Sequence, residues 1–317
     1  MSNIVYFSVP SDVPSGGLKV IYRHSELINE RLGSSQIYNM IQPDSGFACS
    51  WFSHKARIKT DKFLDPGNDF VVLPEGLIFG YWKRLVEMGV NYGIFVQNGY
   101  LMQKNLESSE FHDAYKHAKI ILCISQDVIR CVNHLHPGLS EKICRVTYSI
   151  DRALFKPAEA KEKIITYMPR KMSDHSKLVI AFLEGRLPAG WRLQPIDGVG
   201  ESEVARLLSK SMIFMAFSYF EGLPVPPVEA AHCGNLVIGY TGQGGREYWQ
   251  PPRFTEIPQG DIVSFAEAVL QAARRLDADA SLLDTTAGCE TLFEAFSPDF
   301  EQRLLRDFVS RVDALFA

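Results

Sequence analysis

The chain has 317 residues, which is enough for two domains with complete hydrophobic cores or for one large domain. Its composition, 46% hydrophobic and 22% charged, is typical of a globular protein, and its net charge of −4 argues against nucleic-acid binding as the main task. No apolar stretch approaches the roughly 20 residues that span a bilayer, and the N-terminal segment lacks the basic region and cleavage site of a signal peptide.

The first half of the chain alternates apolar, strand-like runs with helical patterns. The expected strands lie at residues 3–10, 36–41, 69–74, 92–98, 119–125 and 143–148. The expected helices lie at residues 18–32, 76–88, 107–117 and 126–135. Continuous apolar strands that alternate with helices indicate a parallel sheet covered on both faces.

The second half repeats this alternation after a polar linker at residues 149–163. Its expected strands lie at residues 163–169, 191–196, 212–218, 236–240 and 253–257. Its expected helices lie at residues 174–185, 201–210, 226–233 and 264–276. We therefore predict an α/β protein with two Rossmann-like domains, residues 1–157 and 158–297.

A final helix is expected at residues 298–317, with Pro298 in its first turn. We expect it to pack back on the first domain through one apolar stripe, formed by Phe300, Leu304, Phe308, Val312 and Leu315.

Six cysteines are scattered along the chain without a Cys-x-x-Cys pair, and several lie inside apolar runs. This pattern is typical of reduced core residues in a cytosolic protein, and it argues against a disulfide framework or a zinc site.

Two glutamates flank a proline-rich turn after the expected strand at 212–218. In open parallel sheets, ligands bind outside the carboxyl ends of the strands. Glu221 is expected in the loop at this edge, and Glu229 in the first turn of the helix that Pro226 begins. Carboxylates accept hydrogen bonds from sugar hydroxyls, so the pair is suited to hold two sugar rings. An acid in a first helical turn is also stabilised by the helix dipole, so a purely structural role for Glu229 stays open.

A glycine-rich loop, Thr-Gly-Gln-Gly-Gly, follows the next expected strand and includes Gly244 and Gly245. Such a loop allows a phosphate to approach closely and exposes backbone N–H groups to it. A lone Gly-Gly pair is more often an ordinary turn. The acids, prolines and glycines together favour a binding site.

The segment EGLPVPPVEAAHCGNLVIGYTGQGG resembles the E-x7-E signature of the retaining glycosyltransferases of family four, which have the GT-B fold. The resemblance implies two Rossmann-like domains with parallel sheets that face each other across a cleft. It also implies transfer of a sugar from a nucleotide-diphosphate sugar to a hydroxyl acceptor, with retention of configuration. By this resemblance Glu221 binds the donor sugar, Glu229 binds the ribose, and the backbone at Gly222 and Leu223 meets the sugar or the diphosphate.

Looser family features occur elsewhere. Gly16 and Gly17 resemble the glycine-rich loop after the first strand, near the donor phosphates. The family also carries an Arg and a Lys that neutralise the leaving diphosphate. Arg170 and Lys171 stand at this place, with Lys177 further on, and which lysine partners Arg170 stays open. The residues expected to act in catalysis are therefore Glu221, Arg170 and Lys171.

The first half departs from the family pattern at one place. Many relatives carry a His near the reacting sugar, whereas this chain has Gln97 and Asn98, which we assign to the acceptor side. An amide can bond a hydroxyl but cannot act as a base. Transfer on one face of the sugar tolerates this difference, because the leaving phosphate oxygen can take the acceptor proton.

No cofactor and no metal are expected. Asp277 and Asp279 form an Asp-x-Asp pattern, but it reads as a helix end, and the family needs no catalytic metal. The expected partners are the nucleotide-sugar donor and a glycan or lipid-linked acceptor, and nucleic acid is not among them. The basic and aromatic loop at residues 44–63 is a weak candidate for acceptor contact.

The expected location is cytoplasmic, and the expected process is polysaccharide or glycoconjugate biosynthesis. Peripheral contact with the inner face of a membrane, a homo-oligomer and a protein partner stay open. So do two alternatives to the transferase: a non-catalytic scaffold that binds sugar nucleotides, and a GT-B sugar-nucleotide epimerase.

Overall fold

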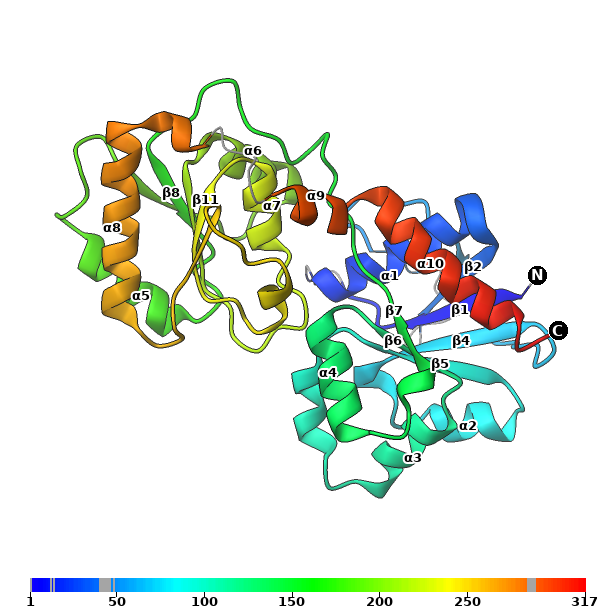
Figure 1. Ribbon diagram of the computed structural model, residues 1–317. Helices are drawn as coiled ribbons and strands as arrows, with labels where there is room; N and C mark the ends of the chain where they lie inside the picture. Colours follow the sequence, from blue (N-terminus) through cyan, green and yellow to red (C-terminus); the bar gives the residue numbers. More distant parts are fainter. Residues whose placement is uncertain (1, 12, 14, 40–46, 48, 284–288) are drawn as a thin grey trace. The chain divides into compact units, whose positions relative to one another are not determined.

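The computed structural model describes residues 2–11, 13, 15–39, 47, 49–283 and 289–317. The chain divides into two compact units, and Figure 1 shows their elements. Unit 1 consists of Met1–Tyr148 and Pro298–Ala317, and unit 2 is Ser149–Ser297. Each unit is built on one parallel sheet with helices, as the sequence predicts.

The unit-1 sheet has seven strands in the order β3-β2-β1-β4-β5-β6-β7. The strands are β1 (Asn3–Ser8), β2 (Ser34–Asn39), β3 (Ile58–Lys59), β4 (Asp69–Pro74), β5 (Asn91–Val96), β6 (Ile120–Cys123) and β7 (Ile143–Arg145). β1 and β4 are neighbours, with Tyr6 opposite Val72. Nearly every residue of β1, β4, β5 and β6 is buried, because helices cover both faces of a parallel sheet.

Helices cover both faces of this sheet, with α1 and α10 on one side and α2 and α3 on the other (Figure 1). The α-helices are α1 (Gly16–Leu27), α2 (Trp82–Glu87), α3 (Ser109–His117), α4 (Gln126–Leu135) and α10 (Pro298–Asp313). The shorter turns are the π-helix η1 (Ile28–Leu32) and the 3-10 helices η3 (Glu75–Leu77), η4 (Gly99–Asn105) and η5 (Ser140–Lys142). The hydroxyl of Ser125 caps α4 by accepting from the N–H of Val128 at 3.0 Å.

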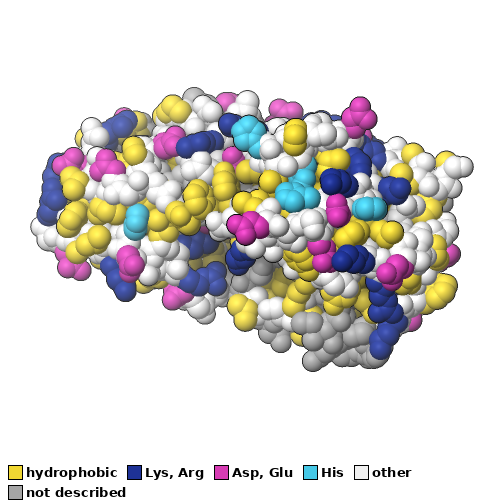
Figure 2. Space-filling view, turned by 90° about the horizontal axis from the view of Figure 1, so that it is seen from below, with side chains coloured by type: hydrophobic (Ala, Val, Ile, Leu, Met, Phe, Trp, Pro, Cys, Tyr) yellow, Lys and Arg dark blue, Asp and Glu magenta, His cyan; other side chains and the backbone are white. Residues whose placement is uncertain are grey.

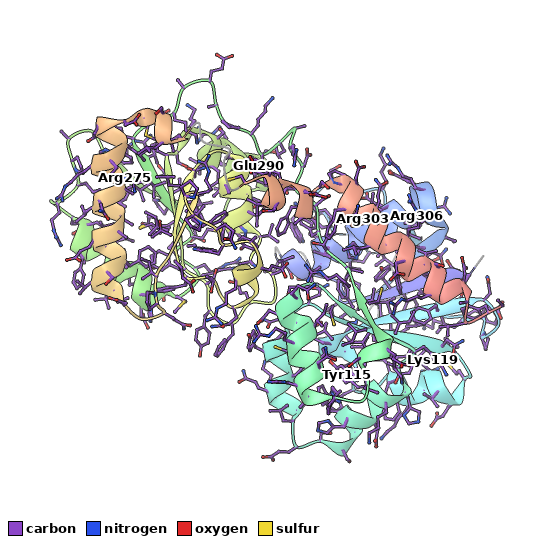
Figure 3. The ribbon with its side chains drawn as sticks, viewed as in Figure 1. Tyr115, Lys119, Arg275, Glu290, Arg303 and Arg306 are labelled. Carbon is purple, nitrogen blue, oxygen red and sulfur yellow. The ribbon has the colours of Figure 1, made fainter. Side chains whose placement is uncertain are left out.

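The buried face of α10 differs from the expected stripe. Leu305, Phe308 and Val312 are fully buried, whereas Leu315 is 38% exposed. Arg303 and Arg306 lie on the exposed face of the helix (Figure 3). The expected stripe used steps of four residues from Phe300 to Val312, whereas the buried face alternates steps of three and four, through Leu305, Phe308 and Val312.

The unit-2 sheet has five strands in the order β12-β11-β10-β8-β9. The strands are β8 (Ile164–Tyr167), β9 (Arg192–Pro195), β10 (Ile213–Ala216), β11 (Leu236–Gly239) and β12 (Phe254–Glu256). The helices are α5 (Ser173–Leu183), α6 (Glu201–Lys210), α7 (Pro226–His232), α8 (Ile262–Ala278) and α9 (Glu290–Ala295), with the 3-10 helices η6 (Gly244–Glu247) and η7 (Ala280–Leu283).

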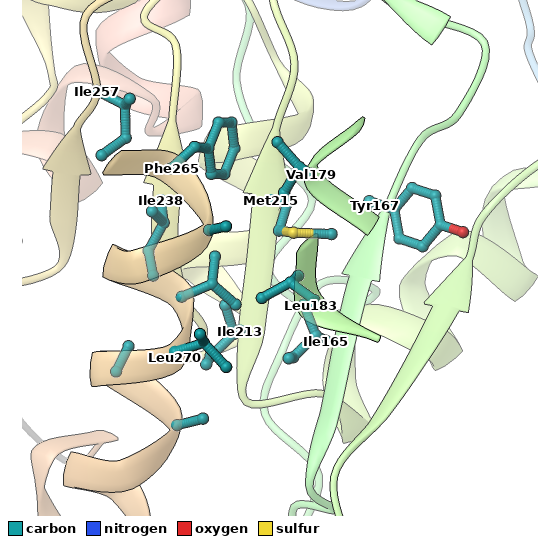
Figure 4. Close-up of a cluster of buried hydrophobic side chains, with 14 of the residues drawn as sticks. Ile165, Tyr167, Val179, Leu183, Ile213, Met215, Ile238, Ile257, Phe265 and Leu270 are labelled. Atoms are coloured by element: carbon teal, nitrogen blue, oxygen red, sulfur yellow. The ribbon is translucent and has the colours of Figure 1, made fainter. Parts of the chain in front are cut away.

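The core of unit 2 lies between the sheet and the helices α5 and α8 (Figure 4). Phe265 of α8 stacks on Phe217 with ring centroids 4.8 Å apart, and Leu183 of α5 is fully buried. Gly239 leaves room for Phe265, because a Cβ there would come within 2.8 Å of the ring. Close packing of this kind fixes where β10 and β11 end, and therefore where their loops begin.

Several short elements were not expected, namely β3, η4 and α9. The helix expected at 76–88 is reduced to α2, because η3 and a turn with Gly80 at φ +88° precede it. Of the loop 44–63, residues 44–46 and 48 lie outside the described residues. The ring of Phe52 packs on Tyr22, with centroids 5.4 Å apart, so this aromatic side chain serves the packing of unit 1.

Acidic and basic side chains are interspersed on the face of the molecule that Figure 2 displays. Among the described residues, no helix is both long enough and apolar enough to cross a membrane.

Candidate functional site

The unit-2 sheet has a topological switch point between β8 and β10. The chain runs from β8 outward to β9 and then returns past β8 to β10. The loops after β8 and β10 therefore leave the sheet in opposite directions and open a crevice between them. Residues 168–172 and 217–225 form these two loops. Of the site residues expected from the sequence, they contain Arg170, Lys171, Glu221, Gly222 and Leu223.

Lys171 and Glu221 meet across this crevice. The Lys171 ammonium donates to both carboxylate oxygens of Glu221, each at 2.7 Å. The side chains are 33% and 22% exposed, so the pair stays accessible to a ligand. Fifty positions separate the two residues in sequence, and the adjacency of β8 and β10 brings them together. The pair unites a cation and an acid at the place where this fold binds ligands.

The Glu221 loop is held by the glycine-rich loop after β11. The backbone N–H of Glu221 donates to the Gly242 carbonyl at 2.8 Å, and the backbone carbonyl of Glu221 accepts from the N–H of Gly244 at 3.0 Å. A Cβ on Gly244 would lie 2.0 Å from the carbonyl oxygen of Gly222, so only glycine fits there. The glycines therefore allow the two loops to pack backbone against backbone.

The N–H groups of Gly244 and Gly245 are both used inside the loop, since that of Gly245 bonds the Thr241 carbonyl at 2.9 Å. The expectation that these two N–H groups are exposed is wrong, because the Glu221 carbonyl accepts that of Gly244 and the Thr241 carbonyl accepts that of Gly245. Gly222 and Leu223 differ: in the described part of the chain, the N–H of neither residue donates a hydrogen bond. Gly222 is a buried residue, and buried N–H groups are nearly always paired, so this group is a candidate donor to a ligand or to ordered water.

Glu229 lies in the first turn of α7, after two prolines, and only 9% of the residue is exposed. The helix ends before Gly234, whose φ of +79° is left-handed, as the sequence predicts. The helix thus holds Glu229 in a largely buried position on the element that follows the Glu221 loop.

The other two cations of the region are exposed. Within the described ranges, the side chains of Arg170 and Lys177 form no hydrogen bond or ion pair. Arg170 lies in the loop after β8, next to Lys171, and Lys177 lies on α5. Of the two candidate lysines, Lys171 is therefore the one that contacts Glu221.

Residues predicted from the first half come together in unit 1. Gly16 and Gly17 begin α1, and the Gln97 amide donates to the Gly17 carbonyl at 3.1 Å. Asn98 caps η4 by accepting from the N–H of Tyr100 at 3.0 Å. The side-chain amides of both residues therefore form hydrogen bonds within unit 1.

Sequence reasoning missed Glu75, which follows β4 directly. Burial raises the pKa of its carboxyl to about 7. Its carboxylate accepts from the N–H of Asn98 at 2.9 Å. The rule that selected Glu221, an acid in the segment that follows a buried strand, would also have selected Glu75.

A recess in unit 2 was missed as well. It has a volume of about 510 Å³ and lies at the ends of β11 and β12, where its lining includes Gln243, Arg246 and Glu256. Gln243 pairs with Glu221 as an isolated parallel bridge, so the recess adjoins the Glu221 loop. The volume falls in the range of small-molecule sites.

Asp277 and Asp279 serve local structure. Asp277 accepts from Lys163 at 2.7 Å and from the Trp191 indole at 3.0 Å, while Asp279 accepts from Ser281. Across the described ranges, no group of three or more His, Cys, Asp or Glu residues is arranged to hold a metal ion.

Solved structures with this architecture cover almost the whole chain. The sucrose-phosphate synthase of Thermosynechococcus elongatus matches with a TM-score of 0.73 and 13% identity, over 99% of this chain and 100% of that one. Anabaena HepE in complex with UDP-glucose matches with a TM-score of 0.71 and 11% identity, over 99% and 100%. A glycosyltransferase from Rickettsia africae matches with a TM-score of 0.67 and 13% identity, over 98% of each chain.

The fold is GT-B. No family model and no curated protein matches the sequence. At identities of 9–13%, the structural matches establish the GT-B architecture alone, and the activity has to be argued from the site.

Proposed function

We propose that this GT-B chain is a glycosyltransferase that moves a sugar from a nucleotide-diphosphate sugar to a hydroxyl group, with retention of configuration. The observation that carries the proposal is the Lys171–Glu221 pair at the switch point of unit 2, beside the unpaired N–H groups of Gly222 and Leu223. A cation and free N–H groups suit a diphosphate, and a carboxylate suits sugar hydroxyls. The UDP-glucose bound to HepE, which shares the fold, supports this class of ligand.

In this scheme the diphosphate displaces Glu221 from Lys171. Arg170, which is free and exposed, adds a planar, bidentate contact. The two cations and the N–H groups of Gly222 and Leu223 stabilise the negative charge that develops on the departing diphosphate. Glu221, released from Lys171, accepts hydrogen bonds from the donor sugar.

Glu229 binds the two ribose hydroxyls in this proposal. Its largely buried position in the first turn of α7 suits a carboxylate that orients a ligand. Lys177, near the start of α5, adds positive charge at a greater distance from the bound diphosphate. Gly244 and Gly245 support the site indirectly, because they let the loop after β11 hold Glu221.

For unit 1 we propose that the first N–H groups of α1, at the Gly16–Gly17 turn, bind a phosphate. Transfer breaks the bond between the anomeric carbon and the phosphate oxygen and forms the bond from the acceptor oxygen on the same face. The acceptor proton passes to the departing phosphate oxygen. No basic side chain is needed at Gln97 or Asn98.

We assign the acceptor to glycans or lipid-linked sugars, and the process to polysaccharide or glycoconjugate biosynthesis in the cytoplasm. The scheme uses no cofactor and no metal, since Arg170 and Lys171 supply the cations. A homo-oligomer, a protein partner or a membrane surface at the acceptor side is compatible with it. The structure of a GtfA/B complex, which shares the fold over 78% of this chain, is a precedent for a partner.

The first test is calorimetric titration with UDP, GDP, ADP and their common sugars. We expect saturable binding of one nucleotide family to the wild type, and binding weakened about tenfold or more in Glu229→Gln, because a charge-assisted hydrogen bond contributes about 1.5–3 kcal/mol. Glu267→Gln, an exposed acid on α8, is the matched control and should bind as the wild type does. Absence of binding at millimolar concentration would refute the proposal.

The second test follows the donor that binds, by NMR, with water and simple saccharides as acceptors. Release of nucleoside diphosphate with a sugar product of unchanged anomeric configuration is the expected result. A changed sugar that stays attached to the nucleotide would indicate an epimerase. Binding without any turnover would indicate a scaffold, and either outcome would contradict the transferase.

A further inference from the structure

The unit-1 sheet also has a topological switch point, between β1 and β4. Beside it, hydrogen bonds connect residues that follow β4 and β5 to the start of α1. In the sheet order, β1, β4 and β5 are consecutive neighbours. Glu75 follows β4 and Gln97 follows β5. Gly17 lies in the first turn of α1, the helix that comes after β1. These residues are 80 positions apart along the chain at most, yet they contact one another at one edge of the sheet.

Glu75 supplies the first link of this line. Its carboxylate accepts from the N–H of Asn98 at 2.9 Å, and the backbone of Gln97 also favours its charged form. In the described part of the chain, the titratable groups of other elements that interact with Glu75 are Tyr115 on α3 and Cys123 on β6, and neither is a cation. Glu75 is only partly exposed, burial raises the pKa of its carboxyl, and groups with such shifted pKa values are concentrated at functional sites.

Gln97 supplies the second link. Its amide nitrogen donates to the Gly17 carbonyl at 3.1 Å. Its amide oxygen lies so close to Gly17 that a Cβ there would come within 2.1 Å of it. The amide therefore packs directly against the Gly16–Gly17 turn, and the position of that turn depends on where Gln97 is held.

We propose that Glu75, acting through Gln97, is a positioning residue that holds the Gly16–Gly17 turn in place for its ligand. The ligand role of the turn rests on the proposed function, whereas the positioning itself does not. Glu75 needs no contact with substrate, since it acts by fixing the backbone after β5. This assigns Gln97 to the support of the donor-side turn, in place of the acceptor side expected from the sequence.

Hydrogen exchange of backbone amides tests the positioning without any ligand. Glu75→Met keeps the size of the side chain and removes the acceptor, whereas Glu75→Gln keeps one acceptor oxygen. In Glu75→Met we expect the amide of Asn98, and that of Lys19 in the first turn of α1, to exchange about tenfold faster, which is the loss of a hydrogen bond to a charged group. Glu75→Gln should stay within about threefold of the wild type, as a partial rescue.

Two further variants keep the test falsifiable. Glu87→Met, at an exposed position of α2, is the matched control and should change neither amide. Gln97→Met breaks only the second link, so it should loosen Lys19 while Asn98 stays protected; it also replaces Glu75→Met if that variant does not fold. Unchanged exchange at Lys19 in Glu75→Met and Gln97→Met would overturn the proposal. Exchange accelerated equally throughout unit 1 would overturn it too, because the role would then be general stability.

Calorimetry with the nucleotide that the wild type binds separates this proposal from the proposed function. We expect the affinity of Glu75→Met to fall about tenfold and that of Glu75→Gln to fall less, in the same order as the exchange rates. If exchange changes as expected and no nucleotide binds the wild type, the positioning stands and the transferase proposal fails. If nucleotides bind wild type and Glu75→Met equally, the positioning of a ligand-binding turn is refuted.

Discussion

Because Lys171 and Glu221 form a pair, we expect a substitution of Glu221 to change the affinity in opposite directions for two kinds of ligand. Glu221→Gln removes the charge that Lys171 contacts in the free protein. Because the two side chains are 33% and 22% exposed, solvent screens the pair, and it contributes about 1 kcal/mol or less. A nucleoside diphosphate without a sugar has to displace Glu221 from Lys171 but gains nothing from Glu221. Its affinity should therefore rise in Glu221→Gln, by up to about fivefold.

The sugar-bearing donor should respond in the opposite direction. It also displaces Glu221, but it regains hydrogen bonds between the carboxylate and the sugar, each worth about 1.5–3 kcal/mol. Its affinity should fall roughly tenfold in Glu221→Gln, after the gain from the freed lysine is subtracted. Lys171→Met should weaken both ligands about tenfold or more, with Lys177→Met as the control that changes them little.

Isothermal titration of the four proteins with a nucleoside diphosphate and with its sugar conjugate measures these affinities. Equal losses for both ligands in Glu221→Gln would refute the exchange of partners. A loss in Lys177→Met as large as that in Lys171→Met would show that the contact with Glu221 does not identify the phosphate-binding lysine.

Three further predictions concern stability. Burial lowers the pKa of His24 to about 4, so the folded state keeps it neutral while the unfolded chain takes up a proton below about pH 6.5. The free energy of unfolding in urea should therefore fall by about 2 kcal/mol between pH 7.5 and pH 5 because of His24. A free energy that does not change over this pH range would contradict the prediction. Gly244→Ala places a Cβ 2.0 Å from a backbone carbonyl oxygen and should destabilise unit 2 by about 1–3 kcal/mol, whereas Gly200→Ala, with nothing within 4 Å, should not, as thermal unfolding would show. Leu183→Ala in the unit-2 core should cost about 2–5 kcal/mol in urea unfolding, against little for Leu178→Ala, which is 49% exposed on the same helix.

Local sequence patterns were sufficient for the architecture. Runs such as 69–74 are buried on both faces of the sheet and are therefore almost continuously apolar. This pattern can be recognised without knowing which strands lie beside them. Several strands end two or three residues earlier than expected, such as β7 at Arg145 against residue 148, but Glu221 still lies in the loop after β10 as expected. The elements that were missed, such as β3 with its two residues and η4, are too short to show a period.

Contacts between distant residues required the tertiary structure. The sequence left open whether Lys171 or Lys177 partners Arg170. The adjacency of β8 and β10 places Lys171 against Glu221. The sequence assigned Gln97 to the acceptor side, whereas in the structure its amide, just after β5, donates to the Gly17 carbonyl.

The sequence by itself determined two Rossmann-like sheets and the edge at which polar residues gather, because hydrophobic periodicity and turn chemistry are local properties of the chain. Only the tertiary structure decided which of those residues are paired, which N–H groups are consumed, and which remain for a ligand. The physical reason is that strand order sets the neighbours of each loop, and hydrogen bonds and ion pairs form only between groups that this order brings within about 3 Å.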